Sequence, residues 1–284
     1  MISYMKSPTT LTLLGTGAGV SPKPNRQSTA AALRVGADTY IIDVGNGVGP
    51  QLVRAGIKLP SIRTIFITHH HLDHVADFGI LIAQGWTAWQ RPVNLIGPPP
   101  LRRMWELFQE MYSIDLKARV EDDGRPELGT LANVSEFTGP GTVYEDNNVK
   151  VTSCPVTHPP LDAYAYRFEG DNFSIVFSGD TGADQRLAQF AKGADVLVHE
   201  ALYPEILVKT LPAKYVDRLM PRMLHAHSPV AQAAQIGAQA GVKHLILSPL
   251  APSNGVSDAQ WLEAASPHFG GKITIGRDLL EITL

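Results

Sequence analysis

The sequence predicts an α/β protein built from two β-sheets that pack face to face, with helices outside them. Three observations lead to this fold class. The 284 residues are 44% hydrophobic and only 18% charged, which is enough apolar material for a sizeable core. The chain runs through two successive halves, each with strands followed by strands that alternate with helices. No linker or low-complexity segment separates the halves, so we expect a single domain over residues 1–284.

The first half opens with short apolar runs separated by glycine and proline. These runs predict strands at 11–17, 31–35 and 39–45, a short helix at 49–55, and a strand at 63–68. Apolar positions at helical spacing then predict helices over 75–90 and 101–113, with a strand beginning at 93 between them. Charged and turn residues predominate between 115 and 142, where we expect strands and loops at a sheet edge.

The second half repeats this order in outline. We expect strands at 149–156, 163–168, 173–180, 195–200 and 244–248, and helices at 184–193 and 228–241. The stretch 202–226 is mixed in character and contains prolines, so it predicts a loop or short helices. Such a stretch either covers the entrance to a site or is a surface segment with no role at the site.

Composition limits the classes of function. A formal net charge of −3 and a pI near 6.4 give no general electrostatic reason to bind nucleic acid. One cysteine, Cys154, excludes an intramolecular disulfide framework and fits a reducing compartment. The N-terminal apolar run is too short for a signal peptide, and no window of about eighteen apolar residues could span a membrane. We therefore expect a cytoplasmic protein.

A dense histidine cluster follows the strand predicted at 63–68. His69, His71, Asp73 and His74 lie within six consecutive positions, together with His70. Alternate side chains of an extended segment point the same way, so His69 and His71 can converge while His70 points elsewhere. A set of imidazoles with a carboxylate suits zinc. As the share of oxygen ligands in such a set increases, it also suits manganese or iron. A chance surface cluster is the alternative, and we favour a metal site.

A metal site needs further ligands, and two later strand ends offer them. His158 comes just after the strand 149–156, and Asp180 comes just after the apolar run of the strand 173–180. Taken alone, His158 is more simply a surface histidine and Asp180 a helix N-cap. In combination with the histidine cluster, the interpretation of both residues as metal ligands is favoured.

The motif set as a whole resembles the metallo-β-lactamase superfamily. It consists of HxHxDH at 69–74, His158, "SGDT" with Asp180, "VHEA" with Glu200, and "HS" at His227. Within that superfamily the pattern is similar to the branch of tRNA 3′-processing endonucleases, arylsulfatases and related phosphodiesterases. The resemblance covers nearly the whole chain and implies a four-layer αββα sandwich.

The resemblance also implies site roles. His69, His71 and His158 would hold one metal ion, Asp73 and His74 a second, and Asp180 would bridge them. The ions would be Zn²⁺, one or two per chain, with Mn²⁺ or Fe²⁺ as alternatives. A water or hydroxide between the ions would be the nucleophile.

The same resemblance implies that His227, oriented by Glu200, protonates the leaving group. We assign His227, Glu200 and Asp73 to catalysis. Without the motif set, Glu200 would be an exposed carboxylate at a strand end and His227 a neighbour of a helix N-cap.

One position departs from the pattern of the superfamily. Pro249 stands where related enzymes usually place a histidine that closes the second metal site. Either the second ion is held weakly by Asp73, His74, Asp180 and water, or another residue such as His225 substitutes, or one metal suffices. We favour the first two explanations together.

A second departure concerns the substrate. The tRNA-processing members usually carry an arm between the third histidine and the bridging aspartate, whereas 22 positions separate His158 from Asp180 here. With the acidic net charge, this argues against tRNA, and nucleic acid is disfavoured as a partner. We expect a metal-dependent hydrolase of a small-molecule ester, with a phosphodiester or aryl sulfate favoured. A carboxylic ester or lactone hydrolase and a non-catalytic metal-bound binding protein are the alternatives, and the resemblance suggests a homodimer.

Overall fold

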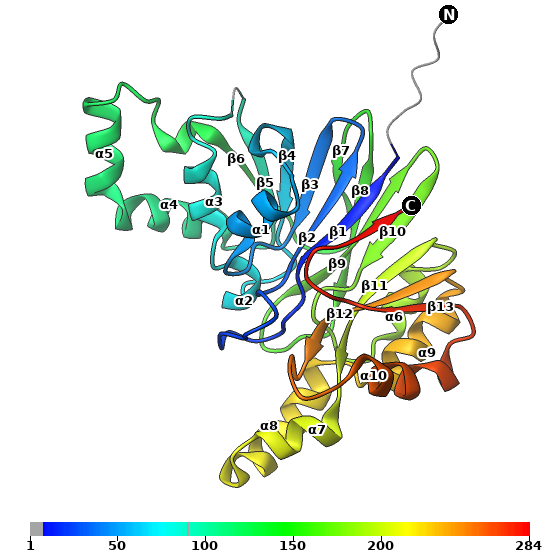
Figure 1. Ribbon diagram of the computed structural model, residues 1–284. Helices are drawn as coiled ribbons and strands as arrows, with labels where there is room; N and C mark the ends of the chain where they lie inside the picture. The colour runs from blue at the N-terminus through cyan, green and yellow to red at the C-terminus, as the bar shows by residue number, and fades with distance from the viewer. Residues whose placement is uncertain (1–7, 90) are drawn as a thin grey trace, which may run out of the picture. The chain divides into compact units, whose positions relative to one another are not determined.

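The computed structural model describes residues 8–89 and 91–284, which form two compact units. Unit 1 contains the residues up to 15, 28–138 and 279–284, and unit 2 contains 16–27 and 139–278. Each unit has one seven-stranded sheet with helices (Figure 1). The predicted repeat of strands and helices in two halves is therefore confirmed. The single domain over 1–284 stays a prediction.

The sheet of unit 1 has the strand order β14-β1-β2-β3-β4-β5-β6. Neighbouring strands from β14 to β3 are antiparallel, and those from β3 to β6 are parallel. The strand bounds are β1 Thr10–Gly15, β2 Ala30–Val35, β3 Asp38–Ile42, β4 Ile62–Phe66, β5 Val93–Gly97, β6 Ala132–Glu136 and β14 Leu280–Thr283.

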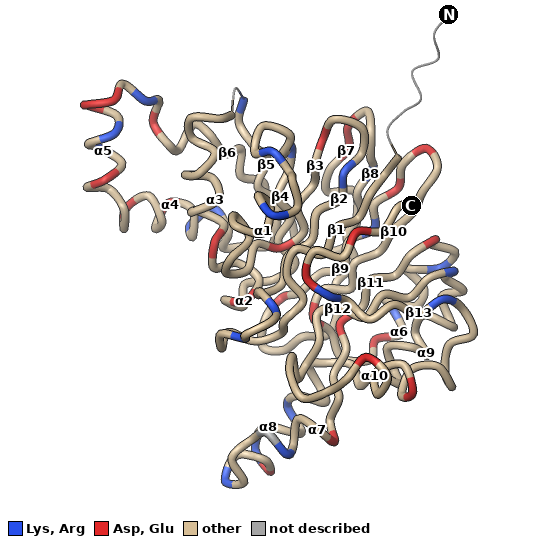
Figure 2. Tube along the Cα trace, in the orientation of Figure 1, with Lys and Arg blue, Asp and Glu red and all other residues tan. Residues whose placement is uncertain are grey.

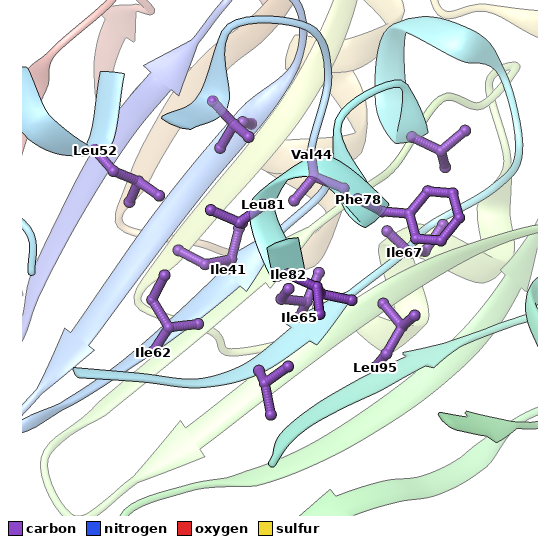
Figure 3. Packing of buried hydrophobic residues seen from close by; sticks show 14 of the residues in the cluster. Ile41, Val44, Leu52, Ile62, Ile65, Ile67, Phe78, Leu81, Ile82 and Leu95 are labelled. Atoms are coloured by element: carbon purple, nitrogen blue, oxygen red, sulfur yellow. The ribbon is translucent and has the colours of Figure 1, made fainter. Parts of the chain in front are cut away.

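Helices of unit 1 bury the apolar side chains of its parallel strands. They are α1 Val48–Arg54, α2 Leu72–Val75, α3 Phe78–Gln84, α4 Leu101–Met111 and α5 Ser113–Glu121, with short 3₁₀ turns at Leu59–Ser61 and Leu128–Leu131. Figure 3 shows Ile41, Ile65 and Leu95 of the strands together with Leu81 and Ile82 of α3 in one apolar cluster. Because the side chains of this cluster are buried and packed against one another, they fix the strand ends from which the histidine segment emerges.

Strands and loops at a sheet edge were expected over residues 115–142. The edge strand β6 agrees with this expectation, which is wrong for residues 115–121 because they belong to α5, Ser113–Glu121. None of its residues is buried, so the helix lacks the apolar periodicity by which the other helices were predicted. The signal that could have revealed it is electrostatic. Arg119 Nε lies 2.7 Å from Asp115 Oδ2, an i,i+4 ion pair that supports an exposed helix.

Unit 2 repeats the strand pattern of unit 1. Its order is β13-β12-β11-β10-β9-β8-β7, antiparallel from β7 to β10 and parallel from β10 to β13. The bounds are β7 Gly141–Glu145, β8 Lys150–Val156, β9 Ala163–Gly170, β10 Phe173–Phe177, β11 Val196–Leu202, β12 His244–Ala251 and β13 Lys272–Ile275.

The helices of unit 2 fall into two groups. Its own apolar cluster includes residues of α6 Gln185–Phe190, α9 Val230–Ala240 and α10 Asp258–Ala265, which is followed by a 3₁₀ turn at Ser266–His268. The other two, α7 Pro204–Thr210 and α8 Ala213–Ala226, extend away from the sheet of unit 2 (Figure 1). The stretch 202–226 thus forms helices rather than a loop, and α8 continues through Pro221.

The helix predicted over 75–90 is shorter than expected. It is divided into α2 and α3, and Gly85 follows the end of α3. Its predicted last residue, Gln90, lies outside the described residues, as does the N-terminal segment 1–7. Within the described residues, no helix has the length and apolarity needed to cross a membrane.

Candidate metal centre

The histidine cluster of unit 1 lies just beyond the carboxyl end of the parallel strand β4. His69 and His74 are fully buried, Asp73 is 7% exposed and His71 is half-buried. His69 Nε2 lies 3.1 Å from His71 Nδ1, and the rings of His69 and His74 are 4.1 Å apart between centroids. The predicted convergence of His69 and His71 is confirmed.

His70 is directed away from this cluster, as predicted. Its Nε2 lies 2.8 Å from the carbonyl oxygen of Pro98, in the loop after β5. Since a carbonyl can only accept, His70 donates through Nε2. The contact gives His70 a structural partner within unit 1.

Asp43 supports the cluster and was not predicted from the sequence. It follows β3 with a φ of 59°, a left-handed conformation that aspartate tolerates better than most residues. Its buried carboxylate accepts the Thr68 N–H at 2.8 Å and the Thr68 hydroxyl at 2.9 Å, and His74 Nδ1 lies 2.8 Å from Oδ2. The signal in the sequence was a carboxylate directly after an apolar strand, the same signal that marked Asp180.

These contacts fix which nitrogen of each imidazole carries the proton. The Thr68 hydroxyl donates to Asp43, so its oxygen accepts from His69 Nδ1 at 3.0 Å. His74 Nδ1 donates to the Asp43 carboxylate in the same way. Both histidines therefore keep a lone pair on Nε2. Histidines that bind metal usually donate their other ring N–H to an acceptor in this way, and bind the ion through the remaining nitrogen.

Close backbone packing holds the Asp43 loop against the cluster. A Cβ on Gly45 would lie 2.2 Å from the carbonyl oxygen of Asp73, so no larger residue fits there. The Val44 N–H donates to the carbonyl of His74 at 2.7 Å. The loop after β3 and helix α2 are thus fixed to each other through the main chain.

In unit 2, His158 follows β8 and is 2% exposed. Its Nδ1 donates to the carbonyl oxygen of Ala226, the last residue of α8, at 2.7 Å. His158 is therefore also a Nδ1–H tautomer with its lone pair on Nε2. The alternative of an ordinary surface histidine is wrong because the side chain is buried.

Asp180 follows the apolar strand β10 and is 3% exposed. It does not cap α6, whose N-cap is Asp184, with a side chain that accepts the Arg186 N–H at 2.9 Å. The adjacent Gly182 donates its N–H to the Thr157 carbonyl at 2.7 Å. The loops that carry His158 and Asp180 are therefore joined directly.

The buried Glu200 pairs with His227, which is 13% exposed, beside Asp180. His227 Nδ1 lies 3.0 Å from each oxygen of Glu200 and 3.8 Å from Asp180 Oδ2. Glu200 also accepts the Thr181 N–H at 2.6 Å and is 2% exposed, so it is not the exposed carboxylate of the alternative interpretation. Burial raises the pKa of Glu200 to about 7; the nearby Asp180 adds to the rise, while His227 opposes it.

Pro249 lies in the buried strand β12. The strand therefore offers no imidazole at the position where related enzymes usually have one. His225, the substitute considered from the sequence, is exposed on α8, whereas His158 and Asp180 of the same unit are buried. This exposure does not favour the substitution.

Each unit thus presents donors that suit a divalent ion. Unit 1 offers three imidazoles and Asp73, and unit 2 offers His158 and Asp180. Fixed tautomers and buried carboxylates fit zinc, for which imidazole nitrogen and carboxylate oxygen are ordinary ligands. The residues present fit the metal that the resemblance implies.

Comparison with known proteins decides the family. The model of the family "Anti-Pycsar protein Apyc1" matches residues 9–213. A ribonuclease Z of Mycobacterium bovis is 30% identical over 275 residues, which cover 95% of this chain and 96% of that protein. The chain belongs to the Apyc1 family and, as a ribonuclease Z homologue, to the metallo-β-lactamase superfamily.

Solved structures of this superfamily agree with the assignment. The metallo-β-lactamase fold protein YhfI of Bacillus subtilis has a TM-score of 0.74 at 19% identity, covering 97% of this chain and 99% of its own. The short form of human tRNase Z has a TM-score of 0.72 at 22% identity and coverages of 96% and 98%. Zinc-bound PqqB of Methylobacterium extorquens has a TM-score of 0.66 at 14% identity, covering 97% of this chain and 100% of its own. The predicted α/β fold of metallo-β-lactamase type is confirmed.

Membership in this family confirms one functional prediction and corrects another. The chain is a metal-dependent hydrolase that acts on ester bonds, as predicted. The predicted partner, a small-molecule ester with nucleic acid disfavoured, is wrong, because the ribonuclease Z relative matches over nearly its whole length. The physical reason is that a net charge of −3 describes the whole chain and hides local clusters of Lys and Arg.

Proposed function

We propose that this Apyc1-family protein is a metal-dependent phosphodiesterase that cleaves RNA, in the manner that the name ribonuclease Z describes for its relatives. The observation that carries the proposal is the 30% identity to a ribonuclease Z over 95% of the chain. The pairing of His227 with the buried Glu200 supports it, since cleavage of an RNA phosphodiester expels a poor leaving group that needs a proton.

We propose the ligand roles that the motif set implies. His69, His71 and His158 would hold one ion, and Asp180 would be shared between it and a second. The fixed Nδ1–H tautomers of His69 and His158 support this assignment, since each directs a lone pair from Nε2. A bound divalent ion would supply an activated water and polarise the phosphoryl oxygens.

Asp73 and His74 would hold the second ion. The carboxylate of Asp43, which accepts from His74 Nδ1, supports His74 as a ligand. Pro249 removes one usual donor, so we expect the second ion to be bound more weakly than the first.

We propose zinc as the ion. The imidazole-rich donors favour it, and PqqB, a structural neighbour, binds Zn²⁺. Elemental analysis of protein purified without added metal should find zinc, at more than one and up to two ions per chain. One ion per chain with full activity would contradict the two-metal assignment.

The proposed catalytic roles fall on residues of unit 2. His227 protonates the leaving oxygen, and Glu200 orients its ring by accepting from Nδ1. The Glu200 carboxyl lies 3.0 Å from His227 Nδ1, and a negative charge at this distance favours the imidazolium form that donates the proton. Asp73 contributes through the second ion. We also propose the cytoplasm as the site of action, in keeping with one cysteine in the chain.

A substrate panel tests the function. The zinc-loaded protein should cleave a precursor tRNA with a 3′ extension, and it should also cleave bis(p-nitrophenyl) phosphate, a generic phosphodiester. An aryl sulfate and an acyl ester of p-nitrophenol complete the panel. Faster turnover of either of these would contradict a phosphodiesterase, and cleavage of the generic diester without cleavage of RNA would contradict RNA as the substrate.

A further inference from the structure

Helices α7 and α8 carry a local excess of positive charge in a chain whose net charge is −3. Between residues 204 and 226 there are four basic residues, Lys209, Lys214, Arg218 and Arg222, and two acidic ones, Glu205 and Asp217. All four basic residues are exposed. Figure 2 shows Lys and Arg along α8, in the part of unit 2 that extends away from its sheet.

Three of these cations share one face of α8. Lys214, Arg218 and Arg222 recur every four residues, so they form a stripe in which successive residues are about 6 Å apart along the helix axis. Val216 and Met220 lie on the less exposed side, and Met220 is 9% exposed. We call Lys214, Arg218 and Arg222 the α8 stripe.

The cations of the stripe differ from those of α4 and α5. In unit 1, Arg103 lies 3.2 Å from Glu106 and 3.0 Å from Glu110, and Arg119 lies 2.7 Å from Asp115. In the described part of the chain no ion pair involves a residue of the α8 stripe. The stripe thus keeps its charge available for an anionic partner.

An aromatic ring lies within the stripe. Tyr215 is 43% exposed, and Lys214 Nζ lies 4.8 Å from the centroid of its ring. Cations with an exposed aromatic side chain are the features by which proteins bind single-stranded nucleic acid, because phosphates pair with the cations and bases stack on the ring. This chemistry fits RNA better than an acidic protein, which offers no bases to stack.

The helix that carries the stripe ends in the candidate site of unit 2. The carbonyl of Ala226 accepts from His158 Nδ1, and His227 follows directly. A Cβ on Gly182 would lie 2.3 Å from the carbonyl oxygen of His225, so the last turn of α8 packs tightly against the Asp180 loop. Arg222 is five residues from His227, or about 7 Å of helical rise.

We infer that the α8 stripe, with Tyr215, is a docking surface for the RNA backbone flanking the scissile bond. The inference rests on the proposed function and adds to it the element that holds the substrate. In tRNA-processing members an arm usually lies between the third histidine and the bridging aspartate. Here the segment between His158 and Asp180 contains β9, β10 and their connections, and the stripe lies in a different part of the chain. Because α8 is joined to the His158 and Asp180 loops, RNA bound to the stripe is aligned with His227.

The test replaces the stripe by neutral residues of similar size, in the triple variant Lys214→Gln, Arg218→Gln, Arg222→Gln. KM for precursor tRNA should rise at least about tenfold, with kcat changed less than KM. Each lost phosphate contact should also lower the slope of log KM against log salt concentration by about 0.7, or about 2 for three contacts. kcat/KM for bis(p-nitrophenyl) phosphate should stay unchanged, because this substrate is too small to reach the stripe.

A matched control removes the same charge elsewhere, in the triple variant Arg103→Gln, Lys117→Gln, Arg119→Gln on α4 and α5. Its KM for RNA should match that of the wild type. Equal effects of both triple variants would show a general charge effect and overturn the inference. So would an unchanged KM in the stripe variant, or an equal loss of activity on the small diester, which would mean that α8 merely supports the site.

Binding measurements separate this inference from the proposed function. In full-length protein carrying Asp180→Asn, which should not turn RNA over, Kd for a labelled RNA is measured with and without the stripe substitutions. Binding weakened at least about tenfold by these substitutions supports the docking surface, even where the wild type fails to cleave RNA and the proposed function falls. Cleavage of RNA by the wild type, with no change in Kd, overturns the docking surface alone.

Discussion

The candidate donors of the two units are assembled in different ways. In unit 1 they come from one segment of six residues, and a single carboxylate, Asp43, fixes Thr68 and His74. In unit 2 they come from the loops at residues 158 and 180, from strand β11 at residue 200 and from the end of α8 at residue 227, and main-chain and side-chain hydrogen bonds join these segments. The first arrangement concentrates the imidazoles that we propose to hold metal, and the second combines a proposed ligand carboxylate with a proposed acid–base pair. The division suggests that unit 1 contributes mainly affinity and unit 2 mainly chemistry.

The largest expected effect is that of Asp180→Ala. Asp180 lies in unit 2 but is proposed to bridge both ions, so its loss should impair metal retention and turnover together. We expect activity on precursor tRNA to fall more than about a thousandfold. Metal content and rate are measured on the same preparation, and an active variant that retains no metal would refute the assignment.

His227→Ala should separate chemistry from affinity. We expect kcat on precursor tRNA to fall about 10²- to 10³-fold while metal content stays constant, since His227 is proposed to move a proton and not to bind metal. The loss should be much smaller on bis(p-nitrophenyl) phosphate, because p-nitrophenolate leaves without protonation. An equal loss on both substrates would argue against a general acid.

Asp43→Asn tests the support of unit 1 at unchanged size. The neutral amide replaces a carboxylate that accepts hydrogen bonds from Thr68 and from His74 Nδ1, so the His74 ring is held less firmly. Metal affinity should therefore fall about 10- to 100-fold. Excess zinc should restore the rate, which distinguishes lost affinity from lost chemistry. A variant whose rate stays low at saturating zinc would place Asp43 in catalysis instead.

The smallest effect concerns stability at a residue remote from the candidate donors of unit 2. Burial and the charge of Lys272 lower the pKa of His244 from 6.5 to about 4. Between these values the unfolded chain binds a proton that the folded chain does not, so stability is present above about pH 6.5 and is lost as pH falls towards 4.

His244→Gln should therefore reduce the loss of unfolding free energy between pH 7 and pH 5 by about 1 kcal/mol. Urea unfolding of the wild type and the variant at both pH values measures the difference. Identical pH dependence in the two proteins would show that His244 titrates normally.

The sequence predicted unit 1's cluster well because its geometry is local. Alternation along an extended segment was enough to place His69 beside His71 and to direct His70 away. Asp43 was missed because its partners lie 25 and 31 positions further along the chain, and a single aspartate after a strand has many uses. The pairing of Glu200 with His227 was predicted from the motif set and not from any spacing.

The helices show the same limit. Those with an apolar face, such as α4 and α9, were predicted, whereas α5 has no buried residue and gave no periodic signal. The substrate prediction failed for a related reason, because net charge was counted over the chain. The α8 stripe becomes apparent once Lys214, Arg218 and Arg222 are known to lie on one helix.

The order in which the chain visits its two units bears on its biosynthesis. In unit 1 the strand at Leu280–Thr283 pairs with that at Thr10–Gly15, and in unit 2 Asp278 accepts from Thr16 and Gln27. Unit 2 is not complete until the ribosome has passed residue 278, and unit 1 is not complete until it has passed residue 283, so neither unit can finish folding from its early segments alone. A gene divided between codons 138 and 139 would leave each fragment without a piece that the other one carries.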